Sequence, residues 1–228
     1  MHTEVNGIDI NYEKMGRRGR DIILLHGNGE DHTMFYELAV LLSENFTVYA
    51  IDSRGHGESE PVDHLSYDEM AEDVVAFIKK KRIKHPIVYG FSDGGILGLL
   101  IAIRHPGLIS KLITSGANLK PTGLKNWFLR QCEIDYAENG SPLIELMLNN
   151  PNITHEELNT IHIPTLILAG ENDLVKNAHT ESIHRNIHGS QLKIIPGEGH
   201  DTYVIHNPKL YDIIAPFLLE ECAEEVHN

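Results

Sequence analysis

Six short apolar runs recur along this chain, at 21–27, 47–52, 85–90, 111–117, 164–170 and 191–197, and helix-like segments separate most of them. The run "DIILLHG" at 21–27 is apolar over nearly its whole length. Such a run is typical of a strand that is buried on both faces of a sheet. Because strands that alternate with helices form parallel sheets with helices on both faces, the sequence predicts an α/β fold.

Two further strands are expected at one edge of this sheet. The segment "TEVNGIDINYE" alternates around Asn6-Gly7, which is a strong β-hairpin signal. The sheet should therefore have eight strands, most of them parallel. Helices are expected at 33–44, 66–83, 94–104 and 177–187, and a last one from Asn207-Pro208. Ser66 and Glu69 have the spacing of a capping box.

The chain of 228 residues is expected to form one domain, residues 1–228. Residues 118–163 interrupt the alternation with several helical pieces, one of which has the capping-box pair Thr154 and Glu157. This segment follows a strand at the carboxyl edge of the sheet, where open α/β sheets bind ligands. We therefore expect it to form a small helical lid over the functional site.

Charge and composition restrict the expected partners. The formal net charge is −14 with histidine neutral, and such a surface repels nucleic acids and anionic lipids. No apolar stretch approaches the ~20 residues that span a bilayer, and residues 1–16 lack the apolar region of a signal peptide. Cys132 and Cys222 lie far apart, as expected of free thiols in a reducing compartment. The sequence predicts a cytoplasmic protein that binds neither nucleic acid nor membrane.

The segment "VYGFSDGGILGLL", residues 88–100, places one serine between a strand and a helix. Gly90, Ser92 and Gly94 form the pattern Gly-x-Ser-x-Gly, which in this context indicates a nucleophile elbow. The sharp turn strains the serine backbone, and small flanking residues avoid collisions with the strand and the helix. The hydroxyl then lies at the tip of the strand, beside the positive N-terminus of the helix. A plain glycine turn is the alternative interpretation.

A serine hydroxyl needs a base to take its proton, and a histidine held by a carboxylate is that base in serine hydrolases. After a nucleophile elbow, the acid and the histidine follow in this order. Asp173 ends "LAGEND" and His200 ends "PGEGH", each just past a predicted strand. Both are therefore expected at the sheet edge that carries Ser92. Glu171, in the same turn as Asp173, is the rival acid.

Attack by the serine on a carbonyl creates an oxyanion, which needs hydrogen-bond donors fixed in advance. The backbone N–H of Asp93, directly after the serine, is the first expected donor. The second is the N–H of Asn28 in "LLHGNGEDH", where a buried strand ends in a glycine-rich loop. No Lys-Ser or Lys-Thr follows that loop, which argues against a phosphate-binding loop. Asp31 and His32 are expected to cap the next helix.

Together these motifs resemble the α/β-hydrolase superfamily over essentially the whole chain. The matching segments are "HGNG" at 26–29, "DSRGHGES" at 52–59, "GFSDGG" at 90–95, "GEND" at 170–173 and "GEGH" at 197–200. The resemblance implies that Ser92 is the nucleophile, Asp173 the acid and His200 the base, with the N–H groups of Asn28 and Asp93 as the oxyanion hole. Serine at position 92 argues against epoxide hydrolases and haloalkane dehalogenases, which look similar but have aspartate there.

The aspartate after the serine is similar to the valacyclovir-hydrolase-like branch of the superfamily, which cleaves amino-acid esters. The resemblance implies that the Asp93 carboxylate meets a substrate ammonium; the alternative is that only its backbone N–H matters. The predicted lid is short, which favours a shallow or partly open pocket. Four of its apolar residues either line the acyl pocket or pack the lid onto the body: Trp127, Phe128, Leu146 and Met147.

Other polar clusters are interpreted as structural. The segment "DSRGHGES" resembles a turn that stabilises the family fold through Asp52, Arg54 and His56. His184 and His188 have a spacing that can bind zinc on a helix, but no third ligand and no HExxH pattern accompanies them. No metal and no cofactor is expected.

The sequence therefore predicts a serine hydrolase that cleaves a small to medium carboxylic ester or thioester through an acyl-enzyme. Its expected partner is a small-molecule ester. Two alternatives stay open. The first is acyl transfer, lyase chemistry or C–C bond hydrolysis by the same residues. The second is a ligand sensor on the same fold.

Overall fold

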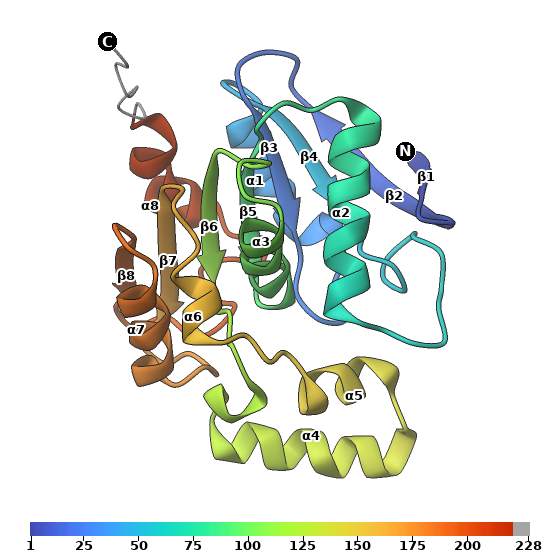
Figure 1. Cartoon of the computed structure of the whole chain (residues 1–228), viewed down its shortest axis with the longest axis vertical. Helices are drawn as coiled ribbons and strands as arrows, with labels where there is room; N and C mark the ends of the chain where they lie inside the picture. The colour runs from blue at the N-terminus through green and yellow to red at the C-terminus, as the bar shows by residue number, and fades with distance from the viewer. Residues whose placement is uncertain (221–228) are drawn as a thin grey trace.

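A computed structural model of the chain describes residues 1–220, so Cys222 lies outside the described residues. Its centre is an eight-stranded sheet with the order β1-β2-β4-β3-β5-β6-β7-β8 (Figure 1). The strands are β1 (His2–Val5), β2 (Ile8–Met15), β3 (Asp21–Leu25), β4 (Thr47–Ile51), β5 (Ile87–Phe91), β6 (Lys111–Ser115), β7 (Thr165–Gly170) and β8 (Gln191–Ile195). The predicted α/β-hydrolase fold class is confirmed.

The predicted hairpin forms the antiparallel edge of the sheet. Strand β1 pairs with β2, and β2 runs antiparallel to β4, whereas every further pairing from β4 to β8 is parallel. Asn6 and Gly7 join β1 to β2 with φ angles of 50° and 79°. Two positive φ angles match the right-handed twist of the paired strands, which explains the choice of Asn-Gly at this turn.

Helices cover both faces of the sheet. They are η1 (His32–Phe35), α1 (Tyr36–Leu42), α2 (Tyr67–Lys81), α3 (Asp93–Arg104), η2 (Pro121–Gly123), α4 (Asn126–Asn139), α5 (Pro142–Asn149), α6 (His155–Leu158), α7 (Asn177–Asn186) and α8 (Lys209–Leu219). Buried side chains of α2, α3 and α7 form one apolar core with the sheet. Those of α1 and α8 form a second core on the opposite face.

Two helix starts differ from the sequence predictions. Ser66 is the N-cap residue of α2, but its side chain makes no capping bond. The Glu69 carboxylate instead lies 3.2 Å from Nη1 of Arg54, which draws it away from the predicted capping box. In α8, Pro208 is itself the cap, and the Asn207 side chain accepts a hydrogen bond from the Lys209 N–H at 3.0 Å. The capping box of Thr154 and Glu157 is confirmed.

Residues 118–163, here called the insertion, connect β6 to β7. Helices α4 and α5 of the insertion project beyond the carboxyl ends of the strands (Figure 1). At its base, Leu124 and Val175 form an isolated antiparallel bridge. The Lys125 N–H donates to the Leu174 carbonyl at 2.8 Å, and the Lys176 N–H donates to the Gly123 carbonyl at 2.9 Å. The insertion is thereby joined by backbone bonds to the loop after β7.

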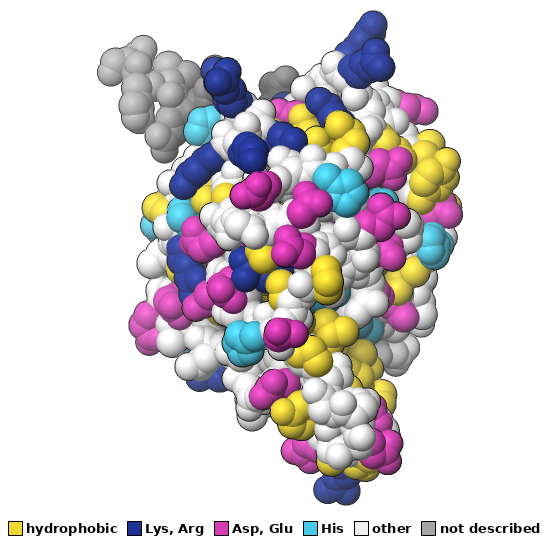
Figure 2. All heavy atoms as spheres, turned by 90° about the vertical axis from the view of Figure 1, so that its right-hand side faces the viewer, with side chains coloured by type: hydrophobic (Ala, Val, Ile, Leu, Met, Phe, Trp, Pro, Cys, Tyr) yellow, Lys and Arg dark blue, Asp and Glu magenta, His cyan; other side chains and the backbone are white. Residues whose placement is uncertain are grey.

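One face of the molecule shows how the surface charge is distributed. On this face, acidic side chains are interspersed with lysine and arginine, and the projecting end carries hydrophobic and acidic side chains (Figure 2). Cys132, in α4, is a buried free thiol as predicted. Within residues 1–220, no helix combines the length and the apolar character needed to cross a bilayer.

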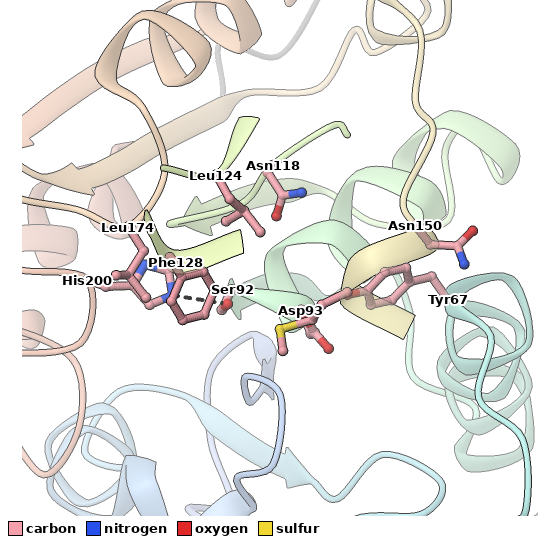
Figure 3. A pocket seen from close by; sticks show the side chains of 10 residues that line it. Tyr67, Ser92, Asp93, Asn118, Leu124, Phe128, Asn150, Leu174 and His200 are labelled. Carbon is pink, nitrogen blue, oxygen red and sulfur yellow. Dashed lines mark hydrogen bonds between the residues drawn. The ribbon is translucent and has the colours of Figure 1, made fainter. Parts of the chain in front are cut away.

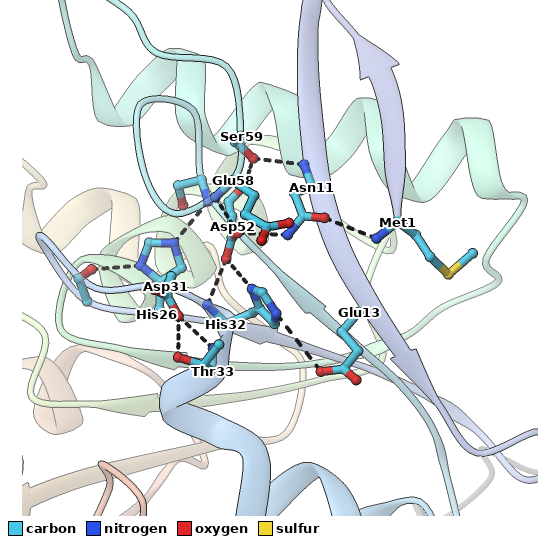
Figure 4. Close-up of polar contacts among 12 residues, drawn as sticks. Met1, Asn11, Glu13, His26, Asp31, His32, Thr33, Asp52, Glu58 and Ser59 are labelled. Carbon is cyan, nitrogen blue, oxygen red and sulfur yellow. Dashed lines mark hydrogen bonds and ion pairs between the residues drawn. The ribbon is translucent and has the colours of Figure 1, made fainter.

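The turn after β4 is held by buried polar contacts (Figure 4). The Asp52 carboxylate accepts hydrogen bonds from the N–H and Nδ1 of His32, both at 2.7 Å, and from Asn11 Nδ2 at 2.9 Å. Arg54 makes a two-pronged contact with Asp73, at 2.6 and 2.9 Å. Asp52 and Arg54 therefore stabilise this turn, as the sequence predicts.

Candidate active site

Ser92 lies in the turn between β5 and α3, with φ 51° and ψ −113°. A Cβ atom on Gly90 would lie 2.0 Å from the Gly94 carbonyl oxygen, and one on Gly94 would lie 2.1 Å from the Leu25 carbonyl oxygen. Because both obstacles are backbone atoms, only glycine fits at either position. The packing thus requires the two glycines of the motif and holds the serine in its strained conformation.

The structure brings Ser92, His200 and Asp173 together at the carboxyl edge of the sheet. His200 Nε2 lies 3.1 Å from Ser92 Oγ (Figure 3). His200 Nδ1 lies 2.6 Å from Asp173 Oδ1. An imidazole with one nitrogen facing a carboxylate and the other facing a hydroxyl has the geometry of a general base.

Asp173 is fully buried, with 0% of its surface exposed. Burial alone would raise the pKa of its carboxyl group. Hydrogen bonds from His200 and from the N–H groups of Val175 and Gly170 outweigh burial and hold the pKa below its ordinary value. Glu171, the rival acid, instead accepts a hydrogen bond from the Gly197 N–H at 2.8 Å. Of the two acids, Asp173 is therefore the one that contacts His200.

Two backbone donors beside Ser92 are free. The flanking N–H groups of Ser92 and Gly94 donate to the Ser115 and His26 carbonyls at 2.7 and 3.0 Å. By contrast, the N–H groups of Asn28 and Asp93 have no acceptor within residues 1–220. Unpaired donors next to a nucleophile are what an oxyanion hole requires.

The Asp93 side chain is also part of the site. It is only 4% exposed, and its carboxylate accepts hydrogen bonds from Tyr67 Oη at 2.8 Å and Asn28 Nδ2 at 3.0 Å. Burial raises its pKa, and these two hydrogen bonds act in the opposite direction. Both donors are neutral, and no cation pairs with this carboxylate in the described part of the chain. Tyr67 carries no motif in the sequence that points to this contact.

A small cavity of about 30 Å³, open to solvent at its mouth, lies against Ser92 and His200 (Figure 3). Its apolar lining comes mainly from the insertion and from the loop after β7: Leu124, Phe128, Met147 and Leu174. Phe128 and Met147 are among the residues predicted to line it. Leu146 is instead 2% exposed and belongs to the core.

The prediction for Trp127 is wrong. Its side chain is 63% exposed and does not line the cavity. The Trp127 ring packs edge-on against the Phe128 ring, with centroids 5.8 Å apart. Adjacent residues on a helix point about 100° apart, so Phe128 can face the cavity while Trp127 faces solvent.

Gly116 is a site residue that the sequence analysis missed. It has φ +66°, and a Cβ atom there would lie 2.7 Å from Cε1 of His200. The glycine therefore leaves the space that the imidazole occupies. Its position directly after β6, at the same sheet edge as Ser92, was the signal that could have indicated it.

One group of residues has ligand atoms close enough to hold a metal ion. Among residues 1–220, this arrangement is found for Asp31, His32 and Asp52, whose ligand atoms lie within 4.8 Å of one another. Hydrogen bonds already occupy these atoms: Asp31 caps η1 through the Thr33 N–H at 2.8 Å, and Asp52 accepts from His32 (Figure 4). The cluster is therefore interpreted as structural. His184, one of the two histidines with a zinc-binding spacing, lies with its Nδ1 2.9 Å from Ser190 Oγ.

The elbow, the free N–H groups and the sheet define an α/β hydrolase. A family model described as the alpha/beta hydrolase fold matches residues 22–142, so the chain belongs to this family. It is 30% identical to the serine hydrolase BPHL of Homo sapiens, covering 88% of this chain and 79% of that protein. The AB hydrolase superfamily protein YisY of Bacillus subtilis is 28% identical, over 87% of this chain and 91% of the relative.

Solved structures show the same fold. An esterase from Exiguobacterium antarcticum superimposes with a TM-score of 0.82 at 22% identity, over 95% of this chain and 97% of the other. The family and these relatives identify the chain as an enzyme of the carboxylic ester hydrolase type.

Proposed function

We propose that this enzyme is a serine hydrolase that cleaves small to medium carboxylic esters or thioesters through an acyl-enzyme at Ser92. The observation that carries the proposal is the unbroken series of contacts from Asp173 through His200 to Ser92, at 2.6 and 3.1 Å. The free N–H groups of Asn28 and Asp93 support it. This combination supplies a base, a nucleophile and an oxyanion hole in one place.

In the acylation step, His200 Nε2 takes the proton of the Ser92 hydroxyl as its oxygen attacks the ester carbonyl. The carbonyl oxygen becomes an oxyanion and accepts hydrogen bonds from the Asn28 and Asp93 N–H groups. Because Asp173 is ionised, it keeps the proton of the neutral imidazole on Nδ1 and stabilises the imidazolium. His200 then protonates the leaving alcohol or thiol.

In the deacylation step, His200 takes a proton from water, and the resulting hydroxide attacks the acyl-enzyme. The same two N–H groups bind the second oxyanion. The carboxylic acid product leaves as the imidazole returns the proton to Ser92. Each step reuses groups that the fold holds in place before substrate arrives.

We further propose that the insertion acts as a lid that forms the acyl pocket. Leu124 and Phe128 belong to the insertion, and both line the cavity beside Ser92. The free space in the cavity is about 30 Å³, far below the ~300–1,000 Å³ of typical small-molecule sites. A cavity of this size and lining favours a short, apolar acyl group.

The Asp93 side chain supports a more specific proposal, in which the substrate carries an amino group. A carboxylate that is 4% exposed and has only neutral partners is poorly compensated. A substrate ammonium beside the scissile ester would provide the missing charge. We propose amino-acid esters as a favoured substrate class, alongside simple acyl esters that use only the Asp93 N–H.

The test is turnover of p-nitrophenyl acetate by the wild-type enzyme and by the Ser92→Ala variant. We expect activity to fall to background in Ser92→Ala, with the circular dichroism spectrum unchanged. Ser43→Ala is the matched control, because the half-buried Ser43 lies at the end of α1 and its hydroxyl donates only to the Val40 carbonyl. Full turnover by Ser92→Ala would exclude Ser92 as the nucleophile.

Mass spectrometry of the quenched reaction separates the proposal from its alternatives. We expect one acetyl group on the peptide that contains Ser92, and acetic acid as the product in water. Transfer of the acetyl group to an added alcohol in preference to water would indicate an acyltransferase. One slow acylation without release would indicate a ligand sensor.

A further inference from the structure

The loop after β3, residues 26–30, is held by hydrogen bonds at its Gly27–Asn28 peptide. The Ser53 N–H donates to His26 Nε2 at 2.9 Å, so the proton of this imidazole is on Nδ1. Nδ1 in turn donates to the Gly27 carbonyl at 2.7 Å. Burial, together with the nearby His56, lowers the pKa of His26 to about 4, so the ring stays neutral at ordinary pH.

The anchored carbonyl determines where the Asn28 N–H points. In a trans peptide, the C=O of one residue and the N–H of the next point in opposite directions. The Gly27 carbonyl is fixed by His26 and by the Glu30 N–H, which lies at 3.3 Å. The Asn28 N–H is therefore aimed away from this anchor, and it is one of the two free donors beside Ser92.

Glu30 holds the same residue from its other side. Glu30 Oε2 accepts a hydrogen bond from the Gly27 N–H at 3.2 Å. A Cβ atom on Gly27 would lie 2.9 Å from this oxygen and 3.1 Å from the Phe91 ring. The Phe91 ring packs against the His200 imidazole, with centroids 4.9 Å apart. The Glu30 carboxyl thus binds the oxyanion loop at Gly27, next to the Phe91 ring that packs on the base.

Three charged or titratable groups act on this carboxyl. Burial raises the pKa of Glu30 to about 7. The Gly27 N–H and the nearby His200 lower it, while Asp201 and Asp93 raise it. Glu30 therefore changes charge near neutral pH. Its ionised form is the stronger acceptor for the Gly27 N–H and the one that attracts an imidazolium.

We propose that Glu30 is a positioning residue, whose ionised carboxylate holds the Gly27 N–H and so fixes the Gly27–Asn28 peptide for oxyanion binding. This inference rests on the proposed function. It adds a third carboxylate to the chemistry, separate from Asp173 and Asp93. Nothing in the sequence motif "HGNGED" assigns Glu30 a part in the reaction.

The proposal predicts an unusual pH dependence. Two groups, His200 and Glu30, must both lose a proton for full activity. The logarithm of kcat/KM should therefore rise with pH more steeply on the acidic side than a single ionisation allows, approaching a slope of 2. An enzyme that depends on the imidazole alone has a slope of 1.

The experiment compares p-nitrophenyl acetate profiles from pH 5 to 9 for wild type, Glu30→Gln, Glu30→Ala and Glu44→Gln. Glutamine keeps an acceptor for the Gly27 N–H but cannot ionise. We expect Glu30→Gln to show a slope of 1 and a kcat at pH 8 about tenfold below that of the wild type, because its neutral side chain resembles the protonated carboxyl group. Glu30→Ala should lose about tenfold or more in kcat with little change in KM, since complete removal of an oxyanion donor costs about 10²–10³.

Glu44→Gln is the control for loss of one surface carboxylate, because Glu44 is exposed and lies just before β4, at the sheet edge opposite to the one that carries Ser92. It should reproduce the wild-type profile. Identical profiles for wild type and Glu30→Gln, or undiminished kcat in Glu30→Ala, would overturn the proposal.

A second measurement is independent of turnover. In ¹³C NMR of the Ser92→Ala variant, we expect one glutamate carboxyl to titrate near pH 7 and the Gly27 amide resonance to shift with it. Both transitions should vanish in the Ser92→Ala/Glu30→Gln double variant. A carboxyl that titrates without any change at Gly27 contradicts the positioning role. If Ser92→Ala is itself fully active, the proposed function fails while the NMR result still reports on Glu30.

Discussion

Asn28 Nδ2 lies 3.0 Å from Oδ2 of Asp93 and also donates to the Leu143 carbonyl at 3.2 Å. Leu143 is in α5, so one side-chain amide connects the loop after β3, the start of α3 and the insertion. The sequence analysis assigned Asn28 a role through its backbone only. The structure shows that its side chain also fixes the carboxylate beside the nucleophile.

Replacement of Asp93 by asparagine tests the amino-ester substrate class. Removal of one partner from a buried charge pair costs about 2–5 kcal/mol. We therefore expect Asp93→Asn to reduce kcat/KM for a glycine or valine ester by about 30-fold or more, because 1.4 kcal/mol corresponds to about tenfold. Hydrolysis of the matched acetyl or isobutyryl ester should change little. An equal loss for both esters in steady-state kinetics would contradict an ammonium-binding role.

The space left by Gly116 is essential for the position of His200. In Gly116→Ala, the new methyl group would overlap the imidazole, and alanine would also have to adopt a positive φ. We expect kcat to fall at least about 100-fold, as a misplacement of about 1 Å typically causes. Gly107→Ala is the control: its φ is +81° but no atom lies within 4 Å of its Cβ position. It should lose some stability and keep its kcat.

The buried pair of Arg54 and Asp73 should contribute strongly to stability. Asp73 is 4% exposed, so Arg54→Met leaves a buried carboxylate without its cation. Such a change typically lowers the free energy of unfolding by about 3–5 kcal/mol. Arg104→Met, which breaks the more exposed pair with Asp68, should cost about 0–1 kcal/mol. Urea denaturation measures the free energy of unfolding of both variants. Equal losses in the two variants would contradict the larger contribution of the buried pair.

The contact between His32 and Asp52 predicts a pH-dependent stability. The hydrogen bond to Asp52 raises the pKa of His32. A raised histidine pKa stabilises the fold below the unfolded value of ~6.5, and the contribution is lost as pH rises through the folded pKa. His32→Gln should therefore destabilise the protein more at pH 5.5 than at pH 8.5. Thermal unfolding at the two pH values gives the comparison, and a pH-independent difference would contradict it.

The parallel sheet and the three candidate catalytic residues were predictable because their signals are local. Each strand is a short apolar run, and Ser92, Asp173 and His200 each follow such a run. Parallel strands bring their carboxyl ends to one edge, so chain order alone places the three residues together. The glycines at 90 and 94 were predictable for the same reason, since the collisions they avoid come from the strand and helix they join.

Other parts of the site depend on packing between distant segments, which leaves no local pattern. Tyr67 reaches Asp93 from α2, and Glu69 pairs with Arg54 in place of the predicted capping box. The orientation of α4 decides that Phe128 faces the cavity and Trp127 faces solvent. No periodicity in the sequence of the insertion determines that rotation.

The bridge between Leu124 and Val175 has a consequence for protein engineering. It attaches the root of the insertion to the backbone only two residues beyond Asp173. A chimaera that exchanges residues 118–163 with those of a related enzyme therefore breaks a contact next to its own acid. Chimaeras should therefore exchange residues 174–176 together with the insertion. This keeps the bridge intact, so that the acyl preference can change without a loss of kcat.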